Sequence, residues 1–363
     1  MRSDTTQEAR DLVSAGRKNL IINGAMEIAQ RGTSTTTLGY QIDRFLTGAA
    51  NINNPTYAQV DVASGTQPYI AGFRKAARLT GGDNAVHSND VLKINQTLEA
   101  QLVAKSGWNY KSGASFITLS FWVKSSVGQT FFGRLQTIDG TDQNYPFSYD
   151  VSANTWTKVV KTIPGNVNIQ MDNDVGSGLD IEWTLYRGVD TTASSTVVNQ
   201  WAAYAASTRL PDGVPSTWHD TNAATWELTG VQLEVGRNAT EFEHRSLAEE
   251  LALCQRYFYR AADGASKALG LGVNYTASEM HCAITFPVTM RITPTLSSAS
   301  GNAYYEFIRN GAADWFNSFT LGNRTTNKIG ELYNNSEISG TVGHGGFVRT
   351  DNAAVYVDFD AEL

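Results

Sequence analysis

Short runs in which apolar and polar residues alternate make up most of the first two thirds of the chain. In residues 117–124, Leu119 and Phe121 share the odd-numbered, apolar face of a predicted strand. Clusters of Gly, Asn, Asp and Pro separate the runs. Many short strands without long amphipathic stretches between them predict an all-β fold, a sandwich or jelly roll. The predicted strands are residues 57–62, 74–80, 91–98, 116–124, 131–138, 157–163, 179–186 and 226–235.

The last of these strands changes parity in its middle. Its apolar residues are even-numbered up to Leu228 and odd-numbered from Val231 onward, with Gly230 between them. One extra residue in a strand has this effect, so we expect a β-bulge at Gly230. Alternating apolar residues return near Cys282 and again near Val357, which predicts a second β module towards the C-terminus.

A helix is predicted between the two modules. Ser246 and Glu249 have the spacing of a capping box, in which each side chain bonds to the other residue's backbone N–H. One apolar stripe, at spacings of 4, 3 and 4 residues, follows on the same helix: Leu247, Leu251, Cys254 and Phe258. The predicted parts are an N-terminal attachment arm (1–18), an N-terminal jelly-roll β-sandwich (19–245), a linking helix (246–262) and a C-terminal β-sandwich (263–363).

Composition narrows the possible functions. Charged residues make up only 17% of the 363 residues, the net charge is −7, and no basic cluster is present. These values argue against nucleic acid and against an anionic membrane surface as partners. No apolar run reaches roughly 18 residues, so we expect no membrane insertion. Two cysteines, Cys254 and Cys282, do not suffice for a disulfide scaffold, which fits a chain folded in a cytoplasm.

Catalytic and metal-binding motifs are weak. None of the five histidines lies in a nucleophile motif, and no zinc spacing occurs, so we expect neither an enzyme nor a cofactor. Asp180 and Glu182 would project from one strand face like the acid pair of a glycosidase, but any alternating strand produces this spacing. Asp172, Asp174 and Asp180 lie in a stretch with the Gly and Asn content of a calcium loop, so a structural calcium ion stays an open alternative.

Aromatic side chains are the most informative signal for sugar binding. A pyranose ring has an apolar face that stacks on Trp or Tyr, and such rings lose little entropy on binding. Loop aromatics also plug the open ends of sandwiches, so both interpretations stay open. The sugar-binding candidates, in loops or in the C-terminal module, are Trp108, Tyr110, Trp218, Tyr305 and Trp315.

Several motifs together resemble known protein groups. NLIINGAMEIAQRGT, YQIDRF, SFWVKS, LDIEWTLYRG and LTGVQLEVG resemble carbohydrate-binding jelly-roll modules of the galactose-binding-like type. TEFEHRSLAEELALCQRYFYR, FPVTMRITPTL and VDFDAEL resemble tail-fibre and other virion surface proteins of tailed bacteriophages. The resemblance covers residues 19–363 and leaves the first 18 unplaced.

This resemblance implies a tail fibre or spike on the virion surface, assembled in the host cytoplasm, that attaches the virion to a host-surface polysaccharide. It implies a homotrimer, with the helix stripe as the candidate contact, and an N-terminal arm that contacts other virion proteins. Related jelly rolls carry a structural calcium near the first strand, where Glu27 would match. The alternative functions are a polysaccharide depolymerase and an architectural collar or head decoration protein.

Overall fold

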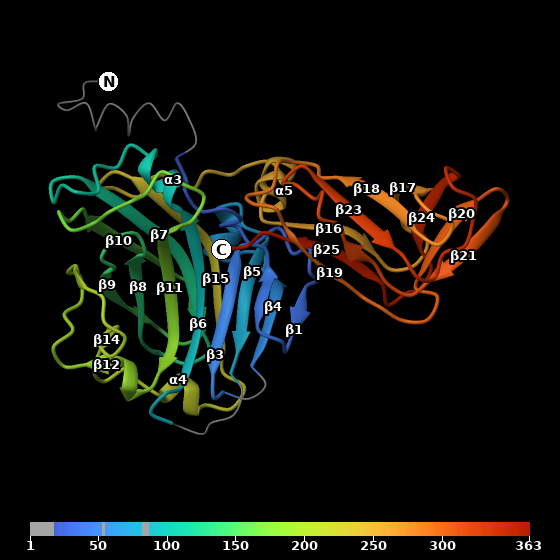
Figure 1. Ribbon diagram of the computed structural model, residues 1–363. Helices are drawn as coiled ribbons and strands as arrows, with labels where there is room; N and C mark the ends of the chain where they lie inside the picture. The colour runs from blue at the N-terminus through green and yellow to red at the C-terminus, as the bar shows by residue number, and fades with distance from the viewer. Residues whose placement is uncertain (1–17, 53–54, 82–86) are drawn as a thin grey trace. The chain divides into compact units, whose positions relative to one another are not determined.

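The chain forms two compact units built mainly from antiparallel sheets (Figure 1). The structure is a computed structural model that describes residues 18–52, 55–81 and 87–363. The first unit extends to Glu250 and includes Leu363, and the second unit is Leu251–Glu362. The predicted all-β class is therefore confirmed.

Two large sheets enclose the core of the first unit. Within the described residues, the six-stranded sheet has the order β1 (Ser34–Thr35), β4 (Thr56–Asp61), β5 (Lys75–Thr80), β15 (Thr225–Val235), β7 (Phe116–Ser125) and β10 (Thr157–Pro164). The seven-stranded sheet has the order β13 (Ala202–Ala203), β9 (Gln143–Val151), β8 (Gln129–Thr137), β11 (Ser177–Arg187), β6 (Val91–Glu99), β3 (Phe45–Ala50) and β2 (Gly39–Ile42). The remaining elements are the parallel pair β12 (Thr192–Ala193) and β14 (Leu210–Pro211), the helices α2 (Gln67–Ile70), α3 (Ala100–Ala104) and α4 (Thr217–Asp220), and the 3₁₀ turn η1 (Val189–Thr191).

Alternation along the strands gives the first unit its core. All eight strands predicted for it are present. The sequence pattern misses β9, in which Pro146 interrupts the strand signal, and it also misses β1, β2, β3, β12, β13 and β14. The odd-numbered face of β7 meets the odd-numbered face of β11, so that the rings of Phe121 and Trp183 pack edge to face with centroids 5.6 Å apart. Trp226 on β15 is also fully buried in this core.

The predicted bulge at Gly230 lets β15 exchange one neighbour for another. Up to Leu228, β15 pairs with β5; between Thr229 and Gln232 its register with β7 shifts, and Gly230 has a φ of 62°. Beyond the bulge the segment that begins at residue 19 takes the place of β5. The backbone N–H of Leu20 donates to the carbonyl of Leu233 at 2.9 Å, and the N–H of Val231 donates to the carbonyl of Gly24 at 2.9 Å.

Side chains lock this N-terminal segment in place. Asn19 donates from Nδ2 to the carbonyl of Val231 at 3.1 Å and accepts the backbone N–H of Leu233 at 3.0 Å. Arg245, whose side chain is 6% exposed, donates to the carbonyls of Asn19 and Ile21 and pairs with the carboxylates of Glu243 and Glu250. Arg245, in the segment that follows β15, thus holds the N-terminal segment that pairs with β15 beyond the bulge.

The second unit combines a small sheet with a large one. Within the described residues, the three-stranded sheet has the order β16 (Phe258–Asp263), β25 (Tyr356–Asp360) and β19 (Thr295–Ser298). The seven-stranded sheet has the order β21 (Ala312–Phe316), β20 (Tyr305–Arg309), β24 (Gly345–Thr350), β17 (Ala268–Asn274), β18 (Met280–Thr285), β23 (Ile329–Asn334) and β22 (Thr320–Leu321). Its core consists largely of aromatic and sulfur-containing side chains, among them Met280, Phe307 and Phe359.

The predicted helix is present but shorter than expected. The capping box forms as predicted: the N–H of Ser246 donates to Glu249 Oε2 at 3.0 Å, and the N–H of Glu249 donates to Ser246 Oγ at 3.3 Å. The helix α5 is Leu247–Gln255, and Phe258 begins β16, where it pairs with Asp360 of β25. The prediction of a helix over 246–262 is wrong beyond Gln255, because the aromatic run around Phe258 favours the pleated strand.

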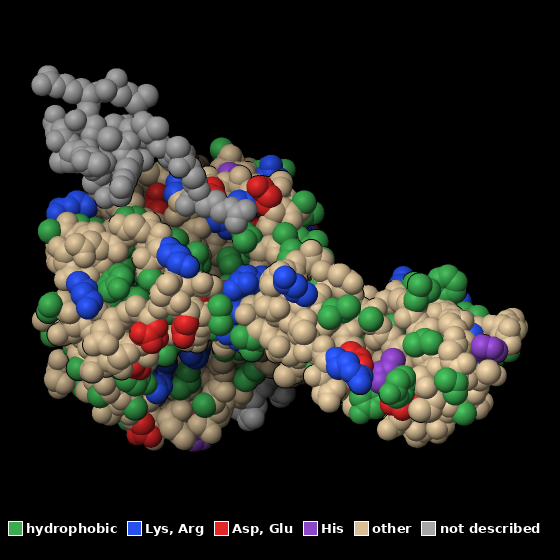
Figure 2. Space-filling view, turned by 45° about the horizontal axis from the view of Figure 1, so that its top comes forward, with side chains coloured by type: hydrophobic (Ala, Val, Ile, Leu, Met, Phe, Trp, Pro, Cys, Tyr) green, Lys and Arg blue, Asp and Glu red, His purple; other side chains and the backbone are tan. Residues whose placement is uncertain are grey.

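Two further predictions concern the N-terminal arm and membrane insertion. Of the arm predicted at residues 1–18, all but Lys18 lies outside the described residues. No helix in the described ranges is long and apolar enough to cross a membrane. On the face that Figure 2 shows, basic and acidic side chains are interspersed.

We predict that Gly230→Ala destabilises the first unit much more than Gly65→Ala does. Both glycines have a positive φ, so an alanine costs about 1–2 kcal/mol of backbone strain at either position. A Cβ at Gly65 would meet nothing within 4 Å, whereas a Cβ at Gly230 would lie 2.6 Å from the ring of Phe73. The clash adds roughly 1–3 kcal/mol, measurable by urea unfolding. Equal losses at the two positions would contradict the role given to the bulge.

Candidate functional site

An open pocket lies where the segment between β12 and β14 folds over strand β9. Its volume is about 270 Å³. Amide, hydroxyl and aliphatic side chains line it, and none of the lining residues is charged. The lining residues, called the β9 pocket below, are Asn144, Pro146, Ser195, Thr196, Val197, Gln200, Ala202 and Thr208.

Backbone and side-chain hydrogen bonds hold the segment over β9. The N–H of Asn199 donates to the carbonyl of Pro146 at 2.7 Å, and Asn144 Nδ2 donates to the carbonyl of Arg209 at 2.9 Å. Strand β13 pairs with β9, and β12 pairs with β14 at the base of the segment. Proline has no N–H to donate to a sheet neighbour, so Pro146 suits this partly unpaired edge. The pocket is therefore formed before any ligand enters.

A buried ion network lies beside the pocket on the outer face of the same sheet. Glu182, which is fully buried, accepts hydrogen bonds from Arg134 at 2.8 and 3.0 Å and from Arg187 at 2.6 Å. The guanidinium of Arg134 also lies 5.8 Å from the ring centroid of Tyr204, which belongs to the segment over β9. The network thus connects the central strands to the residues around the pocket.

The same network makes Glu182 unsuitable as a catalytic acid. Burial alone would raise its pKa, but the positive charges of Arg134, Arg187 and Lys93 outweigh burial and hold the pKa well below its ordinary value. Asp180, its neighbour on the strand face, accepts hydrogen bonds from Asn95 at 2.7 Å and from Thr97. A glycosidase requires one carboxyl group that stays protonated, and the lowered pKa of Glu182 excludes it from that role.

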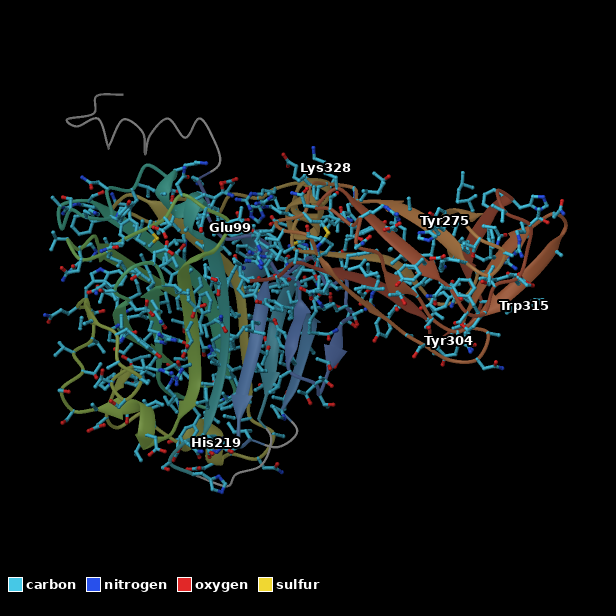
Figure 3. All side chains as sticks on the ribbon, in the orientation of Figure 1. Glu99, His219, Tyr275, Tyr304, Trp315 and Lys328 are labelled. Atoms are coloured by element: carbon cyan, nitrogen blue, oxygen red, sulfur yellow. The ribbon has the colours of Figure 1, made fainter. Side chains whose placement is uncertain are left out.

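Four of the five predicted sugar-binding aromatics are not exposed. Trp108, Trp218 and Tyr305 are buried, and each donates a hydrogen bond to a backbone carbonyl. Tyr110 is half-buried, with its ring 6.2 Å from that of Trp108. Only Trp315 of these five is exposed, at 52% (Figure 3). The three buried rings fill the interiors of the two units and are not available at the surface for a sugar to stack on.

The predicted oligomer contact does not form a single exposed stripe. Leu247 is 63% exposed and Leu251 is half-buried, but Cys254 and Phe258 are buried within this chain. Phe258 is not on the helix, because it begins β16. The four side chains therefore do not form one surface for a second subunit.

The two predicted metal ligands have separate surroundings. Glu27 is half-buried; burial raises its pKa, while the nearby charges of Lys75, Arg74 and His244 lower it in part. Asp180 is bound by an amide and a hydroxyl of β6. No group of three or more His, Cys, Asp or Glu side chains in the described ranges could hold a metal ion.

Sequence reasoning misses the β9 pocket. Residues 196–206 have no clear periodicity, which leaves a short helix or an irregular segment as the two interpretations. The structure shows an irregular segment that contains the two-residue strand β13. The only signal in the sequence is a polar composition around Ser195 and Gln200, and this composition is common to many surface loops.

We predict that Glu182→Gln destabilises the first unit by roughly 3 kcal/mol at pH 7, because it leaves buried cations without their countercharge. The wild-type carboxylate has a lowered pKa in the folded state, so its stabilising effect is complete above the unfolded value near 4.5. The effect is lost as pH falls below that value. The difference between the two proteins, measured by urea unfolding, should therefore shrink below pH 4.5. A difference that stays constant on acidification would contradict this assignment.

The chain was compared with protein-family models, curated proteins and solved structures. No protein-family model matches the chain, and no curated protein matches it. Among solved structures, it is similar to the enzymatically active domain of Bacteriophage CBA120 tailspike protein 4, with 10% identity and a TM-score of 0.31 over 60% of this chain but only 21% of that one. It is similar to the CBM22-1 xylan-binding domain from Paenibacillus barcinonensis Xyn10C (11% identity, 62% of this chain, 100% of that chain, TM-score 0.30). It is also similar to a putative sugar binding protein from Bacteroides thetaiotaomicron (11% identity, 60% of this chain, 100% of that chain, TM-score 0.33). These identities and TM-scores are too low to transfer a function to this chain.

Proposed function

We propose that this chain is a non-enzymatic attachment protein whose β9 pocket binds a neutral polysaccharide. The observation that carries the proposal is a preformed pocket of about 270 Å³ with only uncharged lining residues. Sugar hydroxyls pair with amides and hydroxyls such as those of Gln200 and Ser195, while the apolar ring face packs on aliphatic surface. A strongly charged ligand would find no countercharge among the lining residues, which favours a neutral sugar.

The buried acids support binding rather than cleavage. A depolymerase with this architecture would use a pair of carboxyl groups beside the bound sugar. Glu182 and Asp180, the strongest acid pair suggested by the sequence, are bonded to cations, amides and hydroxyls of their own sheet. The proposal is therefore a binding protein without a catalytic centre.

The biological setting is part of the same proposal. The motifs that resemble tail fibres and other virion surface proteins support a place on the surface of a tailed-phage virion, with host-surface polysaccharide as the receptor. In this setting the N-terminal arm would contact other virion proteins. Attachment requires no chemistry, and a weak single site suffices when several copies bind together.

We predict that Ala202→Leu weakens polysaccharide binding at least about tenfold, whereas Ala203→Leu leaves it unchanged. Both residues are exposed and both belong to β13, but only Ala202 lines the pocket. A leucine at position 202 fills space that the sugar needs. Binding can be measured by the retardation of the protein in native gels that contain soluble neutral glucans, mannans, galactans or xylans.

Three results would count against the proposal. Equal retardation of both variants would show that the polysaccharide does not bind in the β9 pocket. Sustained release of new reducing ends by the wild-type protein would favour a depolymerase. Failure to bind any neutral polysaccharide, together with failure to block phage adsorption when added free, would favour an architectural virion protein.

A further inference from the structure

The seven-stranded sheet of the second unit has an apolar outer face. One face of this sheet covers the core, where Val348 and Met280 are fully buried. The opposite face of an antiparallel sheet is normally polar when water covers it. Here Leu271 is 69% exposed, its cross-strand partner Phe347 is 62% exposed, and Val273 is 41% exposed.

This apolar surface is continuous across neighbouring strands. Phe347 of β24 lies between Leu271 of β17 and Ile308 of β20, because it pairs with both. Trp315 and Tyr275 reach the surface at the flanks, and hydrophobic side chains are visible at the surface of this unit in Figure 2. We call this surface the β17–β24 face; its residues are the exposed Leu271, Val273, Tyr275, Trp315 and Phe347 and the half-buried Ile308.

The charged side chains on one flank of the face are paired with one another. Arg349 bonds to Glu306, which is buried on the neighbouring strand. On the same flank, the indole N–H of Trp315 donates to Asp351 Oδ2 at 3.0 Å. A partner that covers this flank would not have to desolvate an unpaired charge there.

The other flank is organised in the same way. His281 lies with one ring nitrogen 3.0 Å from Glu279 and the other 3.0 Å from Glu331, and its ring stacks on Tyr333. Arg324 pairs with the same Glu331 at 2.8 Å. The polar groups around the apolar centre are thus engaged within the unit.

We infer that the β17–β24 face binds the same face of a second copy of this chain. An apolar surface with internally paired charges is complementary to itself, so no second sequence is needed to match it. Its large side chains expose roughly 500 Å² from each copy. Two copies would bury on the order of 1,000 Å² before the rim is counted, which reaches the lower limit for a specific interface.

A sugar is a poorer occupant for this surface. Its centre consists of Leu, Val, Ile and Phe side chains, which offer no hydrogen bonds to hydroxyl groups, and the polar groups at the flanks are already engaged. Sheets that pack through such side chains lie about 10 Å apart and exclude water. The face therefore fits another sheet, whereas Leu247, Leu251, Cys254 and Phe258 do not form one exposed surface.

The test is the mass of the full-length protein in solution. We expect the wild type to change from monomer to dimer as its concentration rises, measured by sedimentation or by light scattering after gel filtration. Leu271→Glu combined with Phe347→Glu should raise the dissociation constant at least about tenfold. Both side chains already face water, so the variant should fold, and an unchanged thermal midpoint checks this.

A matched control separates this face from general surface hydrophobicity. Ile70 on α2 of the first unit is 69% exposed, the same fraction as Leu271, so Ile70→Glu removes an equally exposed apolar side chain elsewhere. It should leave self-association unchanged. A wild type that stays monomeric at all concentrations would overturn the inference, and so would a double variant that associates as tightly as the wild type. The inference does not depend on the β9 pocket, because Ala202→Leu should associate normally.

Discussion

The first unit depends on the edge of strand β15 beyond its bulge. At Gly230 the strand leaves β5 and exposes backbone groups that must be paired if they are to be buried. The segment that begins at Asn19 provides these partners, and Arg245 holds that segment through two of its carbonyls. Three motifs that carry the resemblance, NLIINGAME, LTGVQLEVG and TEFEHRS, therefore meet in one place.

The buried ion network of the first unit also restricts its conformation. Arg134, Arg187 and Glu182 are buried on the outer face of the sheet, beside strand β9, whose other edge is paired only by the two residues of β13. A buried ion network adds little to net stability but strongly disfavours alternative arrangements, because any displacement leaves a charge without its partner. A preformed pocket loses less entropy on binding than a loop that must first become ordered.

Local patterns predicted local structure well. Alternation located eight strands, the parity change located the bulge at Gly230, and the spacing of Ser246 and Glu249 located the start of α5, since each depends on neighbours in sequence. Local sequence patterns could not predict which aromatic side chains are exposed to solvent. Trp218 and Trp315 both looked like available rings, yet one is fully buried and the other half exposed, because long-range packing decides between them. The end of α5 and the β9 pocket also depend on strands far away in the sequence.

The closure of β15 also affects how the chain can fold. The hydrogen bond from Asn19 to Val231 joins residues 212 positions apart, so the first sheet remains incomplete until its last strand has been made. Contacts of such long range are slow to form, and an emerging chain exposes unpaired strand edges during that time. A chain that ends before β15 would contain most strands of the first unit. It would lack β15, which pairs with the N-terminal segment that begins at residue 19. Such fragments should aggregate. Correct folding of the first unit therefore requires synthesis of the chain through β15.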